Sequence, residues 1–178
     1  MKVFISPQEW QQHTSRIVNI NVNSTDKFHI YASIVLYTAL HACETWKSTA
    51  SIRNTLDVFH RRCIRKILGL SSQDRVTNEK LMRRSGRQAL SEMVQTRRLR
   101  LAGHVLRLPD VRHARVAMTW IPESGRRTSD RPQMTWRTSF KEDLHRMNLT
   151  WHGARRAAND KHRWRNLVAQ CPVPDRRN

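Results

Sequence analysis

The sequence predicts an all-α protein, an irregular helical bundle of about six helices joined by basic loops. Apolar residues recur at spacings of three and four over most of the chain, which is the period of one helix face. No stretch shows the strict apolar–polar alternation of a half-buried strand, and no hairpin turn stands out. We therefore expect a polar, poorly ordered leader over residues 1–27, a helical bundle over 28–108, a basic helical region over 109–172 and a tail over 173–178.

The first predicted helix covers residues 28–46, where apolar residues occur nearly all round the helix, as in the centre of a bundle. Thr25 or Asp26 is expected to cap its start. The apolar stretch 30–43 is shorter than the roughly 18–20 residues that span a bilayer, and three polar residues interrupt it. We therefore expect a buried helix and no membrane partner.

The second predicted helix covers residues 52–68, and three hydroxyl residues before or at its start offer a cap: Ser48, Thr49 and Ser51. Its expected core stripe follows steps of four and three, with cations around it: Ile52, Leu56, Phe59, Cys63 and Ile67. Gly69 is well placed as the C-terminal cap. A loop then leads to a short predicted helix at 78–84.

The predicted helix at 90–108 lies near the middle of the chain, with Ser91 as its expected cap and Pro109 as its stop. Its apolar residues cover about half of the circumference: Leu90, Val94, Leu99, Leu101, Ala102, Val105, Leu106 and Leu108. A row of cationic side chains fills the remaining arc: Arg97, Arg100, His104 and Arg107. Gly103 costs about 1 kcal/mol relative to Ala inside a helix, which suggests that another backbone or a phosphate approaches closely there.

Three more segments complete the predicted fold. A shorter helix is expected at 111–120, followed by a basic loop at 122–132 that is rich in Gly, Ser, Asp and Pro. Thr135 is the expected cap of the next helix, whose core face is Trp136, Phe140, Leu144 and Met147. Thr150 likewise precedes a final helix at 151–168 as its expected cap.

The tryptophans divide into two groups. Trp46, Trp136 and Trp164 stand at helix positions beside apolar neighbours and are expected in the core. Trp120 and Trp151 stand at helix ends and are more open as stacking platforms for nucleic-acid bases.

The chain is strongly basic, with 33 Lys and Arg against 14 Asp and Glu and a net charge of +19. The excess is spread along the chain, and 17 of the 19 basic residues after residue 90 are arginines. The guanidinium fork holds phosphate oxygens bidentately, so a polyanion is the favoured partner and nucleic acid the commonest one. An anionic membrane surface, an acidic protein or mere solubility are the alternatives.

The sequence offers no catalytic site, cofactor site or metal site. It lacks a Gly-rich phosphate loop, and the carboxylate pair Glu142–Asp143 is more typical of a solvated helix face than of a two-metal site. His41 and Cys43 cannot easily converge with His60 and Cys63 on one zinc ion, so Cys63 is better explained as a buried core thiol. Three widely spaced cysteines and the lack of a signal-peptide pattern favour an intracellular protein.

Six segments, in order, resemble landmarks of LINE-type (non-LTR) retrotransposon reverse transcriptases. Residues 42–47 (ACETWK) are similar to the "YG-C/A-ETW" landmark downstream of the catalytic palm, and 59–69 (FHRRCIRKILG) to the "F-RRCLR-ILGI" helix. The others are similar to "VTNEEL", "RRLRW-GHVLR", "GRR-RGRP-KTW" and "DR-RWR", at 76–81, 97–107, 125–136 and 160–165. The departures are His41 for Tyr, Ser72 for Trp and Asp130 for the Gly of "RGRP".

This resemblance implies a thumb-like helical segment followed by the basic C-terminal region of the polymerase, which contacts template and primer backbones. The endonuclease, fingers and palm of such an element are not in the sequence, so we expect a truncated fragment that is no enzyme and binds nucleic acid in the nucleus without sequence specificity. The expected phosphate-binding residues are Arg97, Arg100, Arg107, Arg126, Arg127 and Arg131, with a second strip at Arg61, Arg62, Arg65 and Lys66.

Two alternatives remain at this stage. The chain is a stand-alone basic helical adaptor for RNA, DNA or chromatin, or it is an incomplete interaction domain. In the second case, the apolar arcs of residues 28–46 and 90–108 need the missing polymerase domains as partners.

Overall fold

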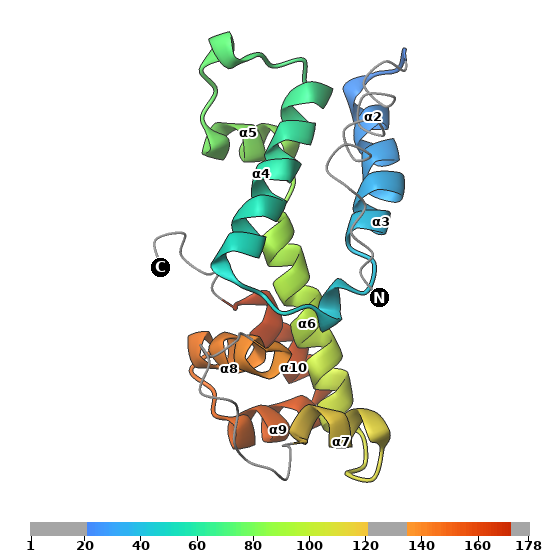
Figure 1. Ribbon diagram of the computed structural model, residues 1–178, viewed down its shortest axis with the longest axis vertical. Coiled ribbons are helices and arrows are strands. Elements are labelled where there is room, and N and C mark those ends of the chain that lie inside the picture. The colour runs from blue at the N-terminus through green and yellow to red at the C-terminus, as the bar shows by residue number, and fades with distance from the viewer. Residues whose placement is uncertain (1–20, 121–134, 172–178) are drawn as a thin grey trace, which may run out of the picture. The chain divides into compact units, whose positions relative to one another are not determined.

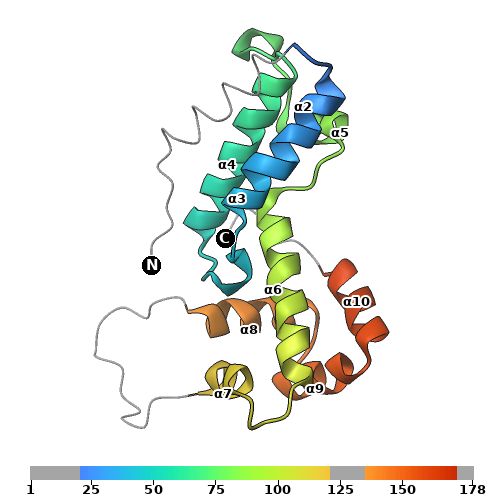
Figure 2. The same cartoon turned by 90° about the vertical axis from the view of Figure 1, so that its right-hand side faces the viewer.

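The structure is a computed structural model that describes residues 21–120 and 135–171 (Figures 1 and 2). Across these ranges the chain is helical and contains no strand, so the predicted all-α class is confirmed. The described residues form two compact units. Unit 1 consists of 21–41 and 55–90, and unit 2 of 42–54, 91–120 and 135–171. The predicted boundaries at 27, 108 and 172 stay predictions.

The first helical segment starts and ends earlier than the predicted 28–46. Helix α2, Ser24–Ile30, continues through a π-helical stretch, Tyr31–Leu36, into the short α3, Tyr37–Ala39. Asn23 caps it, because its side chain accepts a hydrogen bond from the Asp26 backbone N–H at 2.8 Å. The predicted caps Thr25 and Asp26 therefore lie inside the helix. Beyond α3 the left-handed backbone of Ala42 (φ 52°) separates the helix from a 3₁₀ turn, Cys43–Thr45.

Helix α4, Ala50–Ile67, begins two residues and ends one residue earlier than the predicted 52–68. Thr49 caps its start by accepting from the Ile52 N–H at 3.2 Å. At its end, Gly69 takes a left-handed conformation (φ 65°), and the N–H of Leu70 returns to the carbonyl of Arg65 at 2.9 Å. A 3₁₀ turn at Ser72–Asp74 leads to α5, Asn78–Ser85, which Thr77 caps and Gly86 ends.

The buried side of α4 is rotated from the predicted stripe. Cys63 and Ile67 are buried as predicted, but Ile52, Leu56 and Phe59 are only half-buried. Four residues outside the predicted stripe are buried instead: Asp57, His60, Arg61 and Ile64. Polar side chains thus occupy much of this face, which a search for apolar periodicity does not detect.

The core of unit 1 contains a neutral hydrogen-bonded pair, Tyr31 and His60, both without solvent exposure. The Tyr31 hydroxyl donates to Nδ1 of His60 at 2.8 Å, while Nε2–H of His60 donates to the Gln88 carbonyl at 3.1 Å. The two rings are also stacked, with centroids 5.7 Å apart. The buried hydrophobic residues of the unit are Phe28, Tyr31, Val35, Leu36, Leu40, Cys63, Ile64, Ile67, Leu81 and Leu90.

Unit 2 is built from the remaining helices. They are α6, Leu90–Arg107; α7, His113–Thr119; α8, Trp136–Arg146; α9, Trp151–Asn159; and α10, Lys161–Ala169. Thr135 and Thr150 cap α8 and α9 as predicted, accepting from backbone N–H groups three residues on. Ser91 lies inside the first turn of α6, so it is not the predicted cap.

The final helix predicted at 151–168 is two helices. Asp160 has extended backbone angles and separates α9 from α10. Its Oδ1 accepts from the backbone N–H of His162 at 2.8 Å and of Arg163 at 3.0 Å. Because this side chain satisfies two N–H groups of the new helix, the break costs little, and an acidic residue within a helical pattern is the sequence signal of it.

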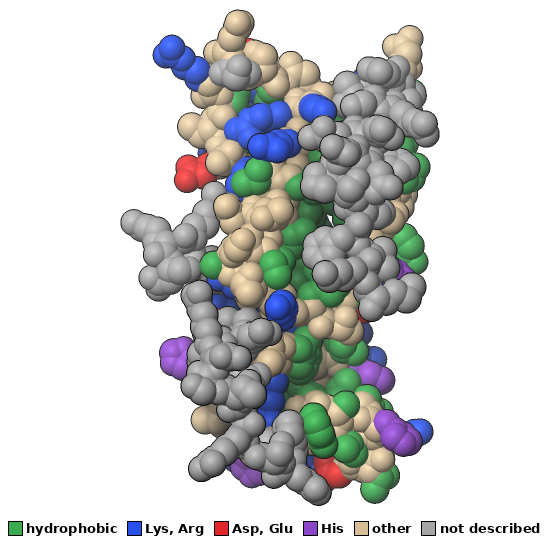
Figure 3. Space-filling model, viewed as in Figure 1, with side chains coloured by type: hydrophobic (Ala, Val, Ile, Leu, Met, Phe, Trp, Pro, Cys, Tyr) green, Lys and Arg blue, Asp and Glu red, His purple; other side chains and the backbone are tan. Residues whose placement is uncertain are grey.

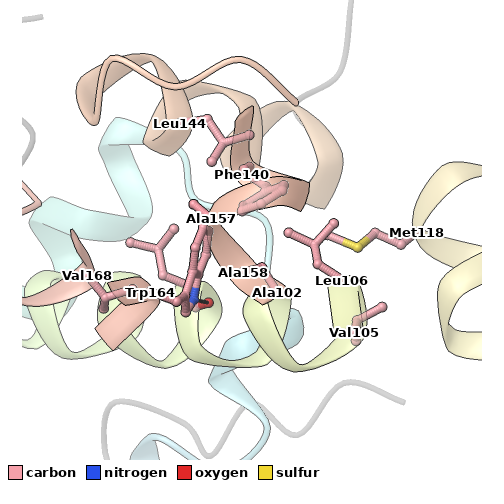
Figure 4. Close-up of a cluster of buried hydrophobic side chains, with 12 residues drawn as sticks. Ala102, Val105, Leu106, Met118, Phe140, Leu144, Ala157, Ala158, Trp164 and Val168 are labelled. Atoms are coloured by element: carbon pink, nitrogen blue, oxygen red, sulfur yellow. Dashed lines mark hydrogen bonds between the residues drawn. The ribbon is translucent and has the colours of Figure 1, made fainter. Parts of the chain in front are cut away.

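The hydrophobic core of unit 2 surrounds the apolar side of α6 (Figure 4). The predicted arc is confirmed, because Leu99, Ala102 and Leu106 are buried here against α8, α9 and α10. The other core members are Val105, Met118, Phe140, Leu144, Ala154, Ala157, Ala158, Trp164 and Val168. The described chain itself therefore covers the apolar arc of α6.

Gly103 lies where α10 packs on α6. A Cβ at this position would overlap Nε1, Cδ1 and Cε2 of Trp164, whose Nε1–H donates to the Leu99 carbonyl at 2.9 Å. The predicted close approach is real, but the approaching group is an indole ring of this chain rather than a backbone or a phosphate. The flat indole occupies the space that the missing side chain leaves.

Candidate nucleic-acid interface

A buried ionic cluster fixes α8 on α6. Asp143, without solvent exposure, accepts from Arg98 through Nε at 2.7 Å and Nη2 at 2.6 Å, and from Arg146 at its other oxygen. Arg98 is only 2% exposed. Burial and the nearby Arg146 lower the pKa of Arg53, which also belongs to this cluster. The predicted solvated face at Glu142–Asp143 is therefore wrong for Asp143, which is a structural ion-pair partner.

The cationic row of α6 lies on the side away from this cluster. Arg97, Arg100 and His104 are exposed, and Arg107 is half-buried. At 100° per residue these side chains lie roughly 40–120° round the helix from Gly103, whereas Arg98 lies roughly 140° round in the opposite sense. Helix α10 lies beside α6 in Figure 2, and its Trp164 packs on Gly103. The angles from Gly103 therefore place the row along one border of the contact between the two helices.

Helix α10 adds cations beside this row. Its apolar residues Trp164 and Val168 are buried. The exposed basic residues in its first five positions are Lys161, His162, Arg163 and Arg165. Arg107 of α6 is held near the end of α9, because its Nη1–H donates to the Ala158 carbonyl at 3.0 Å. We name Arg100, His104, Arg107, Arg163 and Arg165 the α6–α10 seam.

The acidic side chains of unit 2 do not neutralise this seam. Its exposed carboxylates, within the described residues, are Asp110 and Asp160. Asp110 accepts from Arg155 with both oxygens, at 3.0 and 2.8 Å, and from Arg115 at 3.2 Å, and these bonds hold its pKa below the usual range. Asp160 is engaged as the cap of α10, and its hydrogen bonds with the Arg163 and His162 N–H groups likewise lower its pKa.

The second predicted strip, on α4, is only partly at the surface. Arg62 and Lys66 are exposed, but Arg61 is buried. Arg65 is half-buried, and its Nη2 donates to the Val76 carbonyl at 3.1 Å and to Asn78 Oδ1 at 2.9 Å. Arg61 therefore cannot hold a phosphate in this structure, and Arg65 serves first to fix the loop before α5.

On the face shown in Figure 3, basic side chains of the described residues are in view at several places and acidic ones at few. The predicted loop residues Arg126, Arg127 and Arg131 lie outside the described residues. Sequence reasoning left Arg163 and Arg165 out of the predicted site. The sequence does contain a pattern that indicates their exposure. Both flank a tryptophan that stands at core spacing, so their side chains lie to either side of the core-facing line of the helix.

The tryptophans follow the prediction in part. Trp164 is buried, and half-buried Trp136 packs against the core and donates to the Glu44 carbonyl at 2.7 Å. Trp151, predicted to be open, is half-buried: it meets Phe140 edge-on at 5.4 Å, and Arg137 lies over its ring. Trp46 follows the 3₁₀ turn with extended backbone and is half-buried, so it occupies no helix position. Trp120 is 63% exposed.

Cys63 is buried, as the core-thiol interpretation predicted. In the ranges that the structure describes, no group of three or more His, Cys, Asp or Glu side chains is arranged to hold a metal ion. Nor does any described helix combine the length and apolarity needed to cross a membrane.

Comparison of the chain with protein-family models, with curated protein sequences and with solved structures finds no match.

Proposed function

We propose that this chain is a non-catalytic helical fragment of a LINE-type reverse transcriptase, and that it binds nucleic-acid backbones without sequence specificity. The observation that carries the binding is the α6–α10 seam, a set of exposed or half-buried basic side chains on two helices that pack together through Gly103 and Trp164. Of the exposed carboxylates of unit 2 within the described residues, Asp110 is bonded to Arg155 and Asp160 is the cap of α10. The ordered landmarks in the sequence are the ground for the parent family.

The chemistry of the seam suits phosphate. Several guanidinium groups on two packed helices present planar, permanently charged donors at positions that a rigid core fixes. Within the described residues, no hydrogen bond or ion pair occupies the side chain of Arg100 or Arg165. Binding to phosphates releases condensed counterions, so the affinity must fall steeply as salt rises.

Titration of the purified chain against duplex DNA and structured RNA over a range of salt concentrations tests the proposal. We expect a linear fall of log K with log salt, and Arg100→Ala or Arg165→Ala should each reduce the slope by about one. Lys141→Ala is the matched control, because Lys141 is an exposed cation on α8, which packs on the opposite side of α6. An affinity that stays constant between low and moderate salt contradicts backbone binding.

The non-catalytic part of the proposal has its own test. The sequence lacks the adjacent aspartates that bind two metals in a polymerase. We expect no extension of a primer on an RNA or DNA template with added Mg²⁺ or Mn²⁺. Extension by the purified chain would overturn this part and leave the binding proposal standing.

A further inference from the structure

Trp120 is the exposed tryptophan of the described residues, whereas Trp46, Trp136 and Trp151 are half-buried and Trp164 is buried. The indoles of Trp136 and Trp164 donate to backbone carbonyls, and Trp151 packs between Phe140 and Arg137. Trp120, at the end of α7, is 63% exposed, and its indole N–H donates to no other group of the described chain. A large aromatic ring left in water is the informative exception to hydrophobic burial.

The neighbours of Trp120 form one apolar and cationic face. Helix α7 turns Arg115 and Met118 into unit 2, so the opposite side of the helix faces outward. Val116 and Trp120 lie on that side at a step of four, and Arg112, the cap four residues before Val116, extends this row at its start to a length of roughly 12 Å. Arg112 is exposed, and Val116 is 46% exposed.

Hydrogen bonds within unit 2 hold the backbone on which the Trp120 ring is carried. The backbone N–H of Trp120 donates to the Val116 carbonyl at 2.7 Å. The preceding carbonyl, of Thr119, accepts from Nη1 of Arg137 at 3.4 Å, and Arg137 itself lies over the ring of Trp151. A flat ring presented from a fixed backbone, with a guanidinium in the same row, matches an unpaired nucleobase and its phosphate.

We propose that Trp120 is a stacking platform for an unpaired nucleobase, with Arg112 holding a phosphate of the same strand, so that α7 binds single-stranded nucleic acid. This inference rests on the proposed function and narrows its substrate class. A duplex keeps its base faces stacked on one another, so it cannot use the ring, whereas every unpaired base offers a π-face irrespective of sequence.

Fluorescence anisotropy with labelled single-stranded oligonucleotides, an abasic strand of equal length and a duplex tests the platform in the full chain. We expect Trp120→Ala to weaken binding of the single strand on the order of 10-fold and to leave binding of the abasic strand and the duplex unchanged. Trp120→Phe should retain most of the affinity, whereas Trp120→Leu, apolar but not flat, should behave like the alanine variant.

Tyr37→Ala is the matched control, because Tyr37 is also an exposed aromatic residue, 70% exposed, but belongs to unit 1. We expect it to bind single strands like the unchanged protein. If Trp120→Ala binds the single strand as tightly as the unchanged protein, the platform is overturned while backbone binding stands. If the unchanged chain binds neither strand nor duplex, the proposed function fails and the platform with it. If Trp120→Ala weakens binding to anionic lipid vesicles but not to the single strand, the platform is overturned and Trp120 belongs to a membrane-binding surface.

Discussion

Each unit buries one pair of polar side chains that bond to each other, and the two pairs differ in charge. Unit 1 buries Tyr31 and His60 as neutral hydrogen-bonding partners, and unit 2 buries Arg98 and Asp143 as charges. The neutral pair exchanges water hydrogen bonds for protein ones at little electrostatic cost. The charged pair depends on each partner to offset the desolvation of the other. The stability of unit 1 should therefore depend on pH, and the stability of unit 2 should fall sharply when one member of the charged pair is removed.

The largest expected effect breaks the charged pair. Asp143→Ala leaves Arg98 buried without its carboxylate, and we expect the free energy of unfolding to fall by about 3–5 kcal/mol. Urea denaturation followed by circular dichroism measures this loss. In the double variant Arg98→Met/Asp143→Leu both charges are gone, and the loss should be much smaller than for Asp143→Ala alone.

Arg155→Ala is the matched control for this prediction, because Arg155 also pairs with a carboxylate, that of Asp110, but both side chains lie at the surface. Water and salt screen that pair, so no comparable loss is expected. Equal destabilisation by the two substitutions would contradict the view that burial makes the Arg98–Asp143 pair important.

The second prediction concerns pH and unit 1. Burial lowers the pKa of His60 to about 4, below the ordinary value of 6.5. As pH falls below 6.5 the unfolded chain binds a proton that the folded chain refuses until about pH 4, so stability is lost across this window. Between pH 7 and pH 5 the loss should be about 2 kcal/mol.

The comparison that isolates this effect is His60→Gln, which keeps a hydrogen-bonding side chain but does not titrate. Urea denaturation at pH 7 and pH 5 should show a smaller decrease for the variant than for the unchanged chain. Equal decreases would mean that other groups cause the acid sensitivity.

Gly103 gives the third prediction, on how tightly unit 2 packs. In Gly103→Ala the new methyl group overlaps the Trp164 indole, and the cost of overpacking, about 1–3 kcal/mol, exceeds the gain of about 1 kcal/mol in helix propensity. We expect a net loss of up to about 2 kcal/mol in thermal or urea denaturation. In a Trp164→Leu background the same substitution should cost nothing or stabilise, and an unchanged cost there would exclude the indole as the cause.

The sequence was sufficient for the parts of the fold that depend on local chemistry. Thr49, Thr77, Thr135 and Thr150 cap helices, and all but Thr77 were predicted to do so from their hydroxyl side chains and positions. The apolar arc of α6 was also correct, because helical spacing alone decides which residues share a face.

Contacts between residues far apart in the sequence could not be predicted from local patterns. Arg98 and Asp143 are 45 residues apart and look like ordinary surface charges until the fold brings them together. Arg61 illustrates the same limit within the candidate site, since its burial follows from how α4 rotates in unit 1. The exposed cations of α10 follow instead from the buried position of Trp164, so local periodicity is enough to find them.

The smallest expected effect tests the neutral pair directly. Tyr31→Phe removes the hydroxyl that donates to His60 Nδ1 and leaves the stacked rings in place, so we expect a loss of about 1 kcal/mol at pH 7. Urea denaturation measures it, with Tyr37→Phe, a change at an exposed tyrosine, as the matched control. A loss as large as that of Asp143→Ala would contradict the distinction between the units. It would mean that a buried neutral acceptor without its donor costs this protein as much as a buried charge without its partner.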